Sequence, residues 1–394
     1  MLKTTSSKGW QVCIILLVCY NFFNIIILPD EVCKILRYIM FTYFAASSYL
    51  QVSHKINSPF KKCINGFFIL LFISIFMAQI YWNQTIPTTF VSSYGYFCFF
   101  LYFYLYKNKY TPTDIESGFF YASVVFLALF FISHLLYPLR LVRGFGEIQG
   151  IVDTSRGMPR IRLTLMGAAP IYFIFFYYIR QIQEKYSLRQ ALMLILLFAV
   201  IVMQLGRLSI LLSFGLGVYL YLKNINLRTK IFATIVCLGV LYVFVTYVPV
   251  INNMISLTQE QQTEGSDYVR SIAYDFYLHK VSPNILTDIF GNGQYSLGKS
   301  PLGDYIDTHG RSWGLIPADV GYAYMFINFG YIGWGIWFLF FFLIITAKIP
   351  ERYVYIKYYV LFLYLSNFAG NTLLGGIHLL VMSIYVIDQV RVTR

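Results

Sequence analysis

Charged residues are scarce in this chain, at 12% of its 394 residues, whereas soluble domains carry about 25%. Hydrophobic residues make up 58%, and the mean hydropathy is +0.64. Apolar stretches of about 20 residues, the length that a helix needs to cross a bilayer, recur along the sequence. The composition excludes an ordinary soluble domain and predicts an integral membrane protein with many spans. No small-residue cleavage site follows the first apolar run, so we expect no cleaved signal peptide.

Metal, redox and nucleotide motifs are also missing. The six cysteines form no CxxC pair, and the five histidines show neither HxH nor HExxH spacing. We therefore expect the cysteines, and His134 and His378 within spans, to pack against neighbours rather than bind a metal. The sequence GNG at 291–293 predicts a turn and lacks the strand and helix of a nucleotide fingerprint. We expect no metal and no cofactor.

About 12 apolar segments predict membrane-spanning helices: residues 10–28, 34–53, 64–82, 88–106, 118–138, 164–179, 190–206, 208–222, 231–249, 321–347, 354–369 and 372–388. We expect an all-α polytopic membrane protein in which residues 1–394 form a single integral membrane domain.

Positive charge is unevenly divided between the two sets of connections. With a cytoplasmic amino terminus, the cytoplasmic connections carry 18 of the 30 Lys and Arg but five of the 17 acids. The opposite side carries the other 12 bases and 12 acids. The positive-inside rule therefore predicts that both termini are cytoplasmic. The net charge of +13 is a topology signal, and no nucleic-acid partner is expected.

The type of base differs between the two sides. Lysine supplies 12 of the 18 cytoplasmic bases, whereas arginine supplies nine of the 12 outer ones: Arg37, Arg140, Arg143, Arg156, Arg160, Arg162, Arg207, Arg270 and Arg311. The planar guanidinium suits carboxylate and phosphate groups. The pattern favours an anionic ligand at the outer face, and ion pairing with the outer acids is the alternative.

Two outer connections, at about 139–163 and 250–320, are much longer than usual connections, which is typical of functional or disordered loops. The second is rich in aromatic and apolar residues, so we expect a folded cap with short helices, one of them near 266–280.

Arginines mark several candidate anion sites. Arg207 lies in a tight turn between two spans, where it either binds an anion or reaches lipid headgroups. Arg156, Arg160 and Arg162 are crowded at the start of a span, with the same two interpretations. Arg270 on the predicted cap helix either binds the anion or pairs with Asp267 three residues earlier.

The stretch 307–335 is dense in polar and aromatic residues and then descends into the membrane. Asp319 is either a catalytic carboxylate or the N-cap of the following helix. The other candidates in this stretch are His309, Arg311, Trp313, Tyr322 and Tyr324.

In this order, these residues resemble the bacterial O-antigen polymerase family and, more distantly, the O-antigen ligases. The likeness covers most of the chain by topology. It is sharpest at Arg162 followed by Gly167 and Pro170, at QLGRLS (204–209), at Arg270 followed by GNGQ (291–294), and at DVGYAYMFINFGYIG (319–333). Two positions differ from the relatives. Gly-Arg-Leu stands where Ser-Arg-Gly is usual, and Asp319 stands where ligases commonly have histidine, which favours the polymerase.

The resemblance implies a membrane glycosyltransferase of the bacterial inner membrane, similar to the GT-C class, with a large periplasmic cap and a periplasmic active site. Its donor would be an oligosaccharide on undecaprenyl diphosphate, transferred onto the next lipid-linked repeat unit. Membrane lipid, a chain-length regulator and a flippase are the other implied partners.

The residue chemistry agrees with that reaction, because the departing diphosphate gathers negative charge that fixed guanidinium groups stabilise. We expect Arg162, Arg207 and Arg270 to bind the diphosphate, with Arg156, Arg160 and Arg311 as further candidates. Asp319 or His309 would serve as the base. Trp313, Tyr322 and Tyr324 would stack on sugar rings.

Two other functions remain open: an O-antigen ligase and a flippase or other transporter of lipid-linked oligosaccharide. Carriers usually have two similar halves. Here the long loops make the halves unequal, which favours an enzyme.

Overall fold

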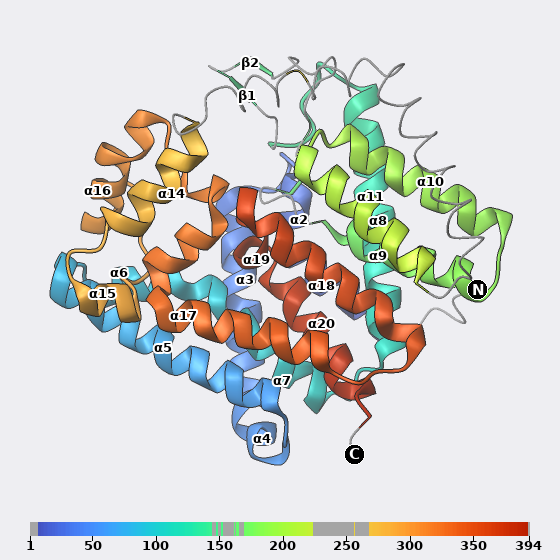
Figure 1. The fold of residues 1–394 in the computed structure, drawn as a ribbon, viewed down its shortest axis with the longest axis horizontal. Helices are drawn as coiled ribbons and strands as arrows, with labels where there is room; N and C mark the ends of the chain where they lie inside the picture. Colours follow the sequence, from blue (N-terminus) through green and yellow to red (C-terminus); the bar gives the residue numbers. More distant parts are fainter. Residues whose placement is uncertain are drawn as a thin grey trace.

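The protein is built almost entirely of helices in a computed structural model (Figure 1). The structure describes residues 7–143, 147–148, 151–152, 161, 163–164, 169–223, 256 and 268–392. The first part contains α1 (Ser7–Cys19), α2 (Asn21–Asn24), α3 (Asp30–Phe44), the π-helical η1 (Ala45–Tyr49), α4 (Leu50–Val52), η2 (Ser53–Lys55), α5 (Pro59–Trp82), α6 (Ile86–Ser92), η3 (Ser93–Phe99), α7 (Phe100–Lys107) and α8 (Pro112–Leu135). A two-stranded antiparallel sheet follows, with β1 (Glu147–Ile148) and β2 (Ile151–Val152).

The second part contains the helices α9 (Pro170–Glu184), α10 (Leu188–Met203) and α11 (Arg207–Leu222). Short helices follow: α14 (Val269–His279), α15 (Ile285–Phe290), α16 (Pro301–His309), η5 (Arg311–Trp313) and η6 (Pro317–Asp319). The chain ends with α17 (Gly321–Thr346), η7 (Glu351–Tyr353), α18 (Val354–Ser366), η8 (Asn367–Ala369), α19 (Thr372–Gly375) and α20 (Ile377–Val390).

The helices agree with the predicted membrane spans in a coarse way. Each predicted span that falls in the described residues contains a helix, and the span predicted at 231–249 lies outside them. Within the described residues, three helices are long and apolar enough to cross a membrane, namely α5, α8 and α17. Others are shorter or divided, as where α6, η3 and α7 share the span predicted at 88–106. A helical membrane protein is therefore supported, while the number of spans stays a prediction.

Local sequence signals begin the two long helices of the first part. The Ser58 hydroxyl accepts a hydrogen bond from the Phe60 N–H (3.1 Å), and Pro59 occupies the first turn of α5. At α8, the Thr111 hydroxyl accepts from the Asp114 N–H (3.2 Å), and the Asp114 carboxylate accepts from the Thr111 N–H (2.8 Å). Both arrangements satisfy amide groups that a helix start leaves unpaired.

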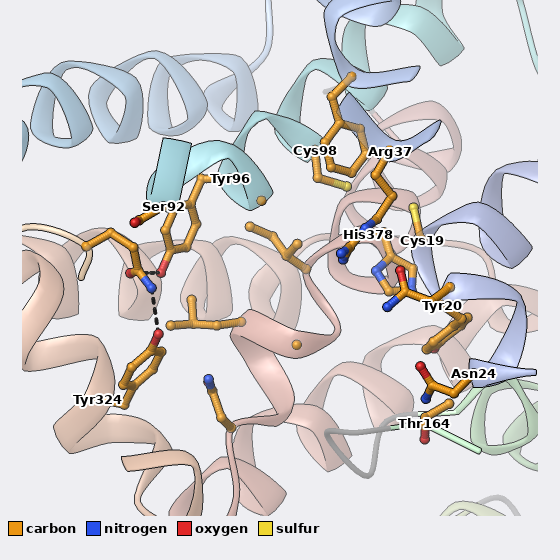
Figure 2. A pocket seen from close by; sticks show the side chains of 18 residues that line it. Cys19, Tyr20, Asn24, Arg37, Ser92, Tyr96, Cys98, Thr164, Tyr324 and His378 are labelled. Carbon is orange, nitrogen blue, oxygen red and sulfur yellow. Dashed lines mark hydrogen bonds between the residues drawn. The ribbon is translucent and has the colours of Figure 1, made fainter. Parts of the chain in front are cut away.

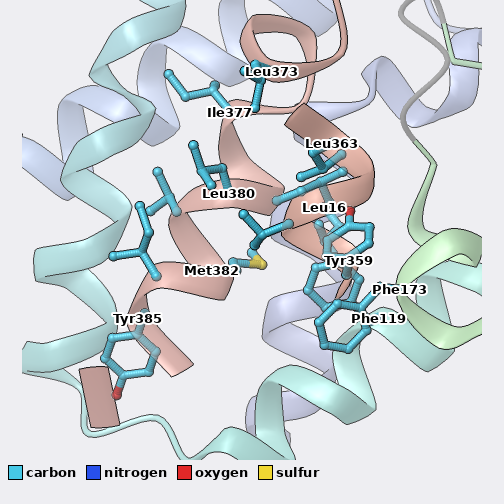
Figure 3. Close-up of a cluster of buried hydrophobic side chains, with 14 of the residues drawn as sticks. Leu16, Phe119, Phe173, Tyr359, Leu363, Leu373, Ile377, Leu380, Met382 and Tyr385 are labelled. Atoms are coloured by element: carbon cyan, nitrogen blue, oxygen red, sulfur yellow. The ribbon is translucent and has the colours of Figure 1, made fainter. Parts of the chain in front are cut away.

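One large hydrophobic core joins α1, α8, α9, α18 and α20 (Figure 3). The rings of Phe119 and Phe173 stack with their centroids 4.0 Å apart, next to Tyr359. Leu16, Leu363 and Leu380, among others, complete this cluster. Burial of apolar area at about 25 cal/mol per Å² makes such a core the main stabilising contact between these helices.

The short helices of residues 268–320, called here the cap segment, have a second hydrophobic cluster. The helix predicted near 266–280 is observed as Val269–His279. Its Tyr277 is fully buried, and the Tyr277 hydroxyl donates to the Leu315 carbonyl (2.5 Å). The cluster contains Ala273, Phe276, Tyr277, Val281, Tyr295, Leu302, Ile306, Leu315, Val320, Ala323 and Ile327. Because its last members belong to α17, the cluster attaches the cap segment to the bundle.

A bend in α17 makes room for the segment Gly291–Gln294. The bend lies at Gly330, whose φ of +60° and ψ of −160° interrupt the helix. The Asn292 N–H donates to the Ile327 carbonyl (2.6 Å), and the Gly293 N–H donates to the Asn328 carbonyl (3.3 Å). These bonds join the cap segment directly to the backbone of α17.

Two carboxylates at the end of the bundle away from the cap segment have hydrogen-bond donors. Glu116 is 2% exposed, accepts a hydrogen bond from the Tyr355 hydroxyl (2.7 Å) and pairs with Arg352 (3.4 Å). Asp388 accepts from the hydroxyls of Ser58 (2.8 Å) and Tyr102 (2.8 Å), and also from Tyr106.

Replacing Gly293 by alanine is predicted to destabilise the protein strongly. Gly293 has φ of +77°, and a Cβ there would lie 2.5 Å from the Ser74 carbonyl oxygen of α5. We expect Gly293→Ala to cost about 2–4 kcal/mol, read as a lower midpoint of thermal unfolding in detergent. Gly298→Ala is the matched control, because Gly298 also has positive φ (+63°) but open space around it. Equal losses in the two variants would show that the contact with α5 contributes nothing.

The hydrogen bond between Tyr355 and Glu116 is predicted to contribute measurably to stability. Tyr355→Phe leaves one oxygen of a buried carboxylate without its donor, which costs about 1–3 kcal/mol. Tyr353→Phe removes a hydroxyl that forms no hydrogen bond within the described part of the chain, so it should change the unfolding midpoint little. A Tyr355→Phe variant as stable as Tyr353→Phe would contradict this role.

Candidate functional site

Arg207 and Arg270, far apart in the sequence, lie near each other in the fold. Arg207 is the first residue of α11, after a turn in which Leu205 adopts φ of +59°. Arg270 is in the first turn of α14. Burial lowers the pKa of Arg207, Tyr268 opposes that shift, and the positive charge of Arg270 lowers the pKa further. The positive charges of the two arginines therefore act on each other, and an anion bound by both would relieve this repulsion.

Tyrosines surround this arginine pair. The Arg270 guanidinium lies 5.8 Å from the ring centre of Tyr268. On the same helix, burial raises the pKa of Tyr274 to about 12, although the nearby backbone of Tyr322 and the charge of Arg270 lower it. The Tyr274 hydroxyl donates to the Phe368 carbonyl (2.9 Å). The helix α14, which carries Arg270, therefore contacts the start of α17 and the turn after α18.

Tyr322 itself is packed rather than open. It is 6% exposed, its hydroxyl donates to the Tyr364 carbonyl (3.0 Å), and its ring contacts Phe338 and Phe368. In this conformation a sugar would not reach the ring. Tyr322 instead supports the position of Tyr274.

His309, Arg311 and Trp313 lie on the surface of the cap segment. The His309 ring stacks on Tyr305 with the ring centroids 4.4 Å apart, and Arg311 pairs with Asp307 (3.2 Å). Trp313 is 77% exposed, so a face of its ring is open to a ligand.

Asp319 is half-buried at the end of η6, immediately before α17. The N-cap position of α17 is occupied by Val320 without a side-chain hydrogen bond, so Asp319 does not serve as that cap. In the part of the chain that the structure describes, Asp319 forms no ion pair and no hydrogen bond with His309, whose Nδ1 lies 3.1 Å from the Tyr305 carbonyl oxygen. The two candidate bases are therefore not directly bonded to each other.

The remaining predicted arginines, Arg156, Arg160 and Arg162, lie outside the described residues, as does Asp267. Their neighbours Leu163 and Thr164 are described.

The sequence GNGQ and Tyr324 form a hydrogen-bonded network, and its residues come from three separate segments. The Gln294 side-chain amide donates to the Tyr324 hydroxyl (2.6 Å) and accepts from the Tyr96 hydroxyl (3.0 Å). The Gln84 side chain donates to the Gln294 backbone carbonyl (2.8 Å). The network places Gln294 and Tyr324 at a fixed point on the wall of a cavity.

That cavity has a volume of about 240 Å³ and is shown in Figure 2. Tyr96 and Tyr324 lie at one end, and the Arg37 guanidinium lies beside the His378 ring at the other. The other lining residues include Cys19, Tyr20, Asn21, Asn24, Phe41, Ser92, Cys98, Thr164, Gln294, Asn371, Leu374 and Ile377. Within the predicted topology, these residues lie at the outer ends of their spans.

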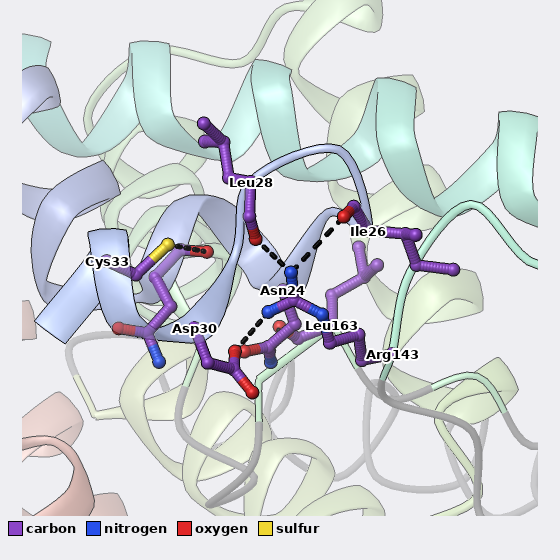
Figure 4. Close-up of polar contacts among 8 residues, drawn as sticks. Asn24, Ile26, Leu28, Asp30, Cys33, Arg143 and Leu163 are labelled. Atoms are coloured by element: carbon purple, nitrogen blue, oxygen red, sulfur yellow. Dashed lines mark hydrogen bonds and ion pairs between the residues drawn. The ribbon is translucent and has the colours of Figure 1, made fainter.

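The wall formed by α2 is held from outside by Arg143 (Figure 4). Arg143 pairs with Asp30 and donates to the carbonyls of Leu28 and Ile26 (3.2 Å for Ile26). The Asn24 side chain donates to the Leu163 carbonyl (3.0 Å). Arg143 is thus structural. Its backbone N–H donates to the carbonyl of Asn24 (2.9 Å), a residue that lines the cavity.

The role of two cavity residues is not evident in the sequence. Arg37 is one of many outer arginines, and His378 is predicted only to pack within a span. In the structure His378 is 3% exposed, and its Nε2 has no hydrogen-bond partner among the described residues. The one sequence signal that could have indicated Arg37 is its place near the start of an apolar span. Arg207 has the same signal.

Comparisons with known proteins add no further constraint. No protein-family model matches this sequence, no characterised protein is detectably similar to it, and no solved structure matches its fold. A function for this chain must therefore come from its residues and their geometry.

Proposed function

We propose that this protein is a membrane glycosyltransferase of the O-antigen polymerase type. It transfers a growing glycan from undecaprenyl diphosphate onto the next lipid-linked repeat unit at the periplasmic face of the inner membrane. The observation that carries the proposal is the approach of Arg207 and Arg270, which are separated by more than 60 residues in the sequence.

The arginine pair suits the leaving group of this reaction. A diphosphate gains negative charge as the glycosidic bond breaks, and guanidinium groups held in place stabilise that charge without reorganising. Two like charges that repel in the free protein become favourable when a dianion lies between them. Arg162 is a third candidate on the grounds of sequence alone.

The acceptor hydroxyl needs a base, and Asp319 is the better candidate. It lies directly before α17, close in sequence to Tyr324, and its carboxylate is not committed to an ion pair among the described residues. His309 is more exposed and is stacked on Tyr305. The open ring of Trp313 offers a platform for a sugar of the glycan.

The first experiment is deletion of the gene in its bacterial host, followed by size-resolved electrophoresis of the surface glycan. A polymerase mutant should replace the long ladder with a core that carries one repeat unit. If no repeat reaches the core, the proposal is wrong. Lipid-linked repeats at the outer face would then indicate a ligase, and repeats held at the inner face would indicate a flippase.

Loss of either arginine should reduce polymerisation far more than loss of a remote one. We expect Arg207→Gln and Arg270→Gln to lower the rate about 10²–10³-fold, because each removes a donor to the leaving group. Arg207→Lys should restore only part of this, since lysine lacks the bidentate fork. Arg189→Gln is the control, because Arg189 is exposed at the far end of α10. The measurement is ladder length after complementation, at matched protein levels. Full activity of both glutamine variants would exclude the arginine pair from the reaction.

Removal of the Asp319 carboxylate tests the base. Asp319→Asn should lower the rate about 10²–10⁴-fold, the usual contribution of a general base. Asp307→Asn, which alters an exposed carboxylate paired with Arg311, should leave the ladder unchanged. An active Asp319→Asn together with an inactive His309→Ala would move the role to His309.

A further inference from the structure

Among the described residues, the cavity beside Arg37 has a positive charge and no counter-charge. Arg37 is the only Asp, Glu, Lys or Arg among the described residues that line it. Within the described residues, the Arg37 side chain forms no ion pair, and its Nε is buried without a hydrogen-bond partner. Neither Arg207 nor Arg270 lines the cavity, so it is separate from the arginine pair.

Other buried polar atoms around the cavity also lack partners among the described residues. They are Tyr20 Oη, Asn21 Oδ1, Asn371 Oδ1 and His378 Nε2. The side chains of Tyr20, Asn371 and His378 are buried. Each unsatisfied buried group costs about 1–3 kcal/mol. Their convergence on one space is expected where a ligand supplies the missing hydrogen bonds.

The backbone that presents Asn21, one of these groups, is strained. Asn21 to Asn24 all have φ between +51° and +57°, so α2 is a left-handed turn. In residues other than glycine this conformation costs about 1–2 kcal/mol each. It places Tyr20, Asn21 and Asn24 on the cavity wall, and such strain is typical of positions that function requires.

We propose that this cavity binds a phosphate group of a lipid, with Arg37 pairing to the phosphate oxygens. The Tyr20 hydroxyl and a ring N–H of His378 supply further hydrogen bonds. The side-chain N–H groups of Asn21 and Asn371 also donate when each amide is turned by 180°, which exchanges its oxygen and nitrogen. A phosphate accepts hydrogen bonds from several directions, which matches donors on α2, α3 and α20 and in the turns before α2 and α19. A neutral sugar would leave the charge of Arg37 unbalanced in a poorly solvated space.

The volume and the surroundings fit a headgroup with its tail outside. At about 240 Å³, the cavity exceeds the roughly 30 Å³ share of a single water molecule several-fold. On α3, the helix that carries Arg37, Ile35 and Ile39 are 54% and 61% exposed, so this helix also presents an apolar face to its surroundings. Both a prenyl diphosphate and a phospholipid have this chemistry. The site does not depend on the proposed glycosyl transfer.

The test measures binding of two probes to the delipidated full-length protein in maltoside detergent by native mass spectrometry. The probes are farnesyl diphosphate and phosphatidylglycerol. Measurements are made in an Arg207→Gln/Arg270→Gln background, which removes the other arginine pair. We expect at least one probe to bind, Arg37→Gln to weaken it at least tenfold, Arg37→Lys to weaken it less, and Arg189→Gln to leave it unchanged. If Arg37→Gln weakens the binding of farnesyl diphosphate alone, the ligand is a prenyl diphosphate. If it weakens the binding of phosphatidylglycerol alone, the ligand is a phospholipid.

The proposal is overturned if Arg37→Gln binds both probes within twofold of the background protein and keeps the same unfolding midpoint. If Arg37→Gln does not fold, Asn371→Ala and His378→Ala are measured in its place, with the same tenfold criterion. Equal displacement of the bound probe by malonate and by inorganic diphosphate would also overturn it, because the site would then not distinguish carboxylate from phosphate.

Discussion

The backbone contact between Gly291–Gln294 and the first half of α17 holds the cap segment on the helical bundle. It requires the bend at Gly330 and a residue without Cβ at 293, where α5 lies against the chain. Because Gln294 then bonds to Tyr324 and Tyr96, the same contact sets one wall of the cavity. The fold and the cavity wall therefore depend on the same contact between Gly291–Gln294 and α17.

The charged side chains at the two ends of the bundle differ in how they are paired. Glu116 and Asp388 are surrounded by hydroxyl donors and, for Glu116, by Arg352. Arg37 has no such partner among the described residues, and Arg207 lies near another arginine. Burying a charge is costly unless it is paired. The carboxylates are therefore structural, whereas Arg37, which is unpaired among the described residues, can pair with an anion from outside.

Local patterns were sufficient to predict much of the fold. Apolar runs placed helices at α5, α8 and α17, and the mixed composition of 250–320 predicted short helices such as α14. Predicting the candidate sites was harder. Arg207 and Arg270 were both singled out, but Tyr322 proved to be buried, and His309 and Asp319 form no hydrogen bond with each other within the described residues. Exposure and pairing of a side chain depend on segments that its own neighbours in sequence do not reveal.

The sequence by itself determined that this is a helical membrane protein, because hydrophobicity and helix-starting signals act over a few turns of chain. It also marked the outer face as rich in arginine. Only the tertiary structure decided which arginines lie together, and that Arg37 and His378 share a cavity with Tyr20 and Asn371. The physical reason is that a cavity has no local signal: it arises where helices of unrelated sequence leave polar groups facing one space.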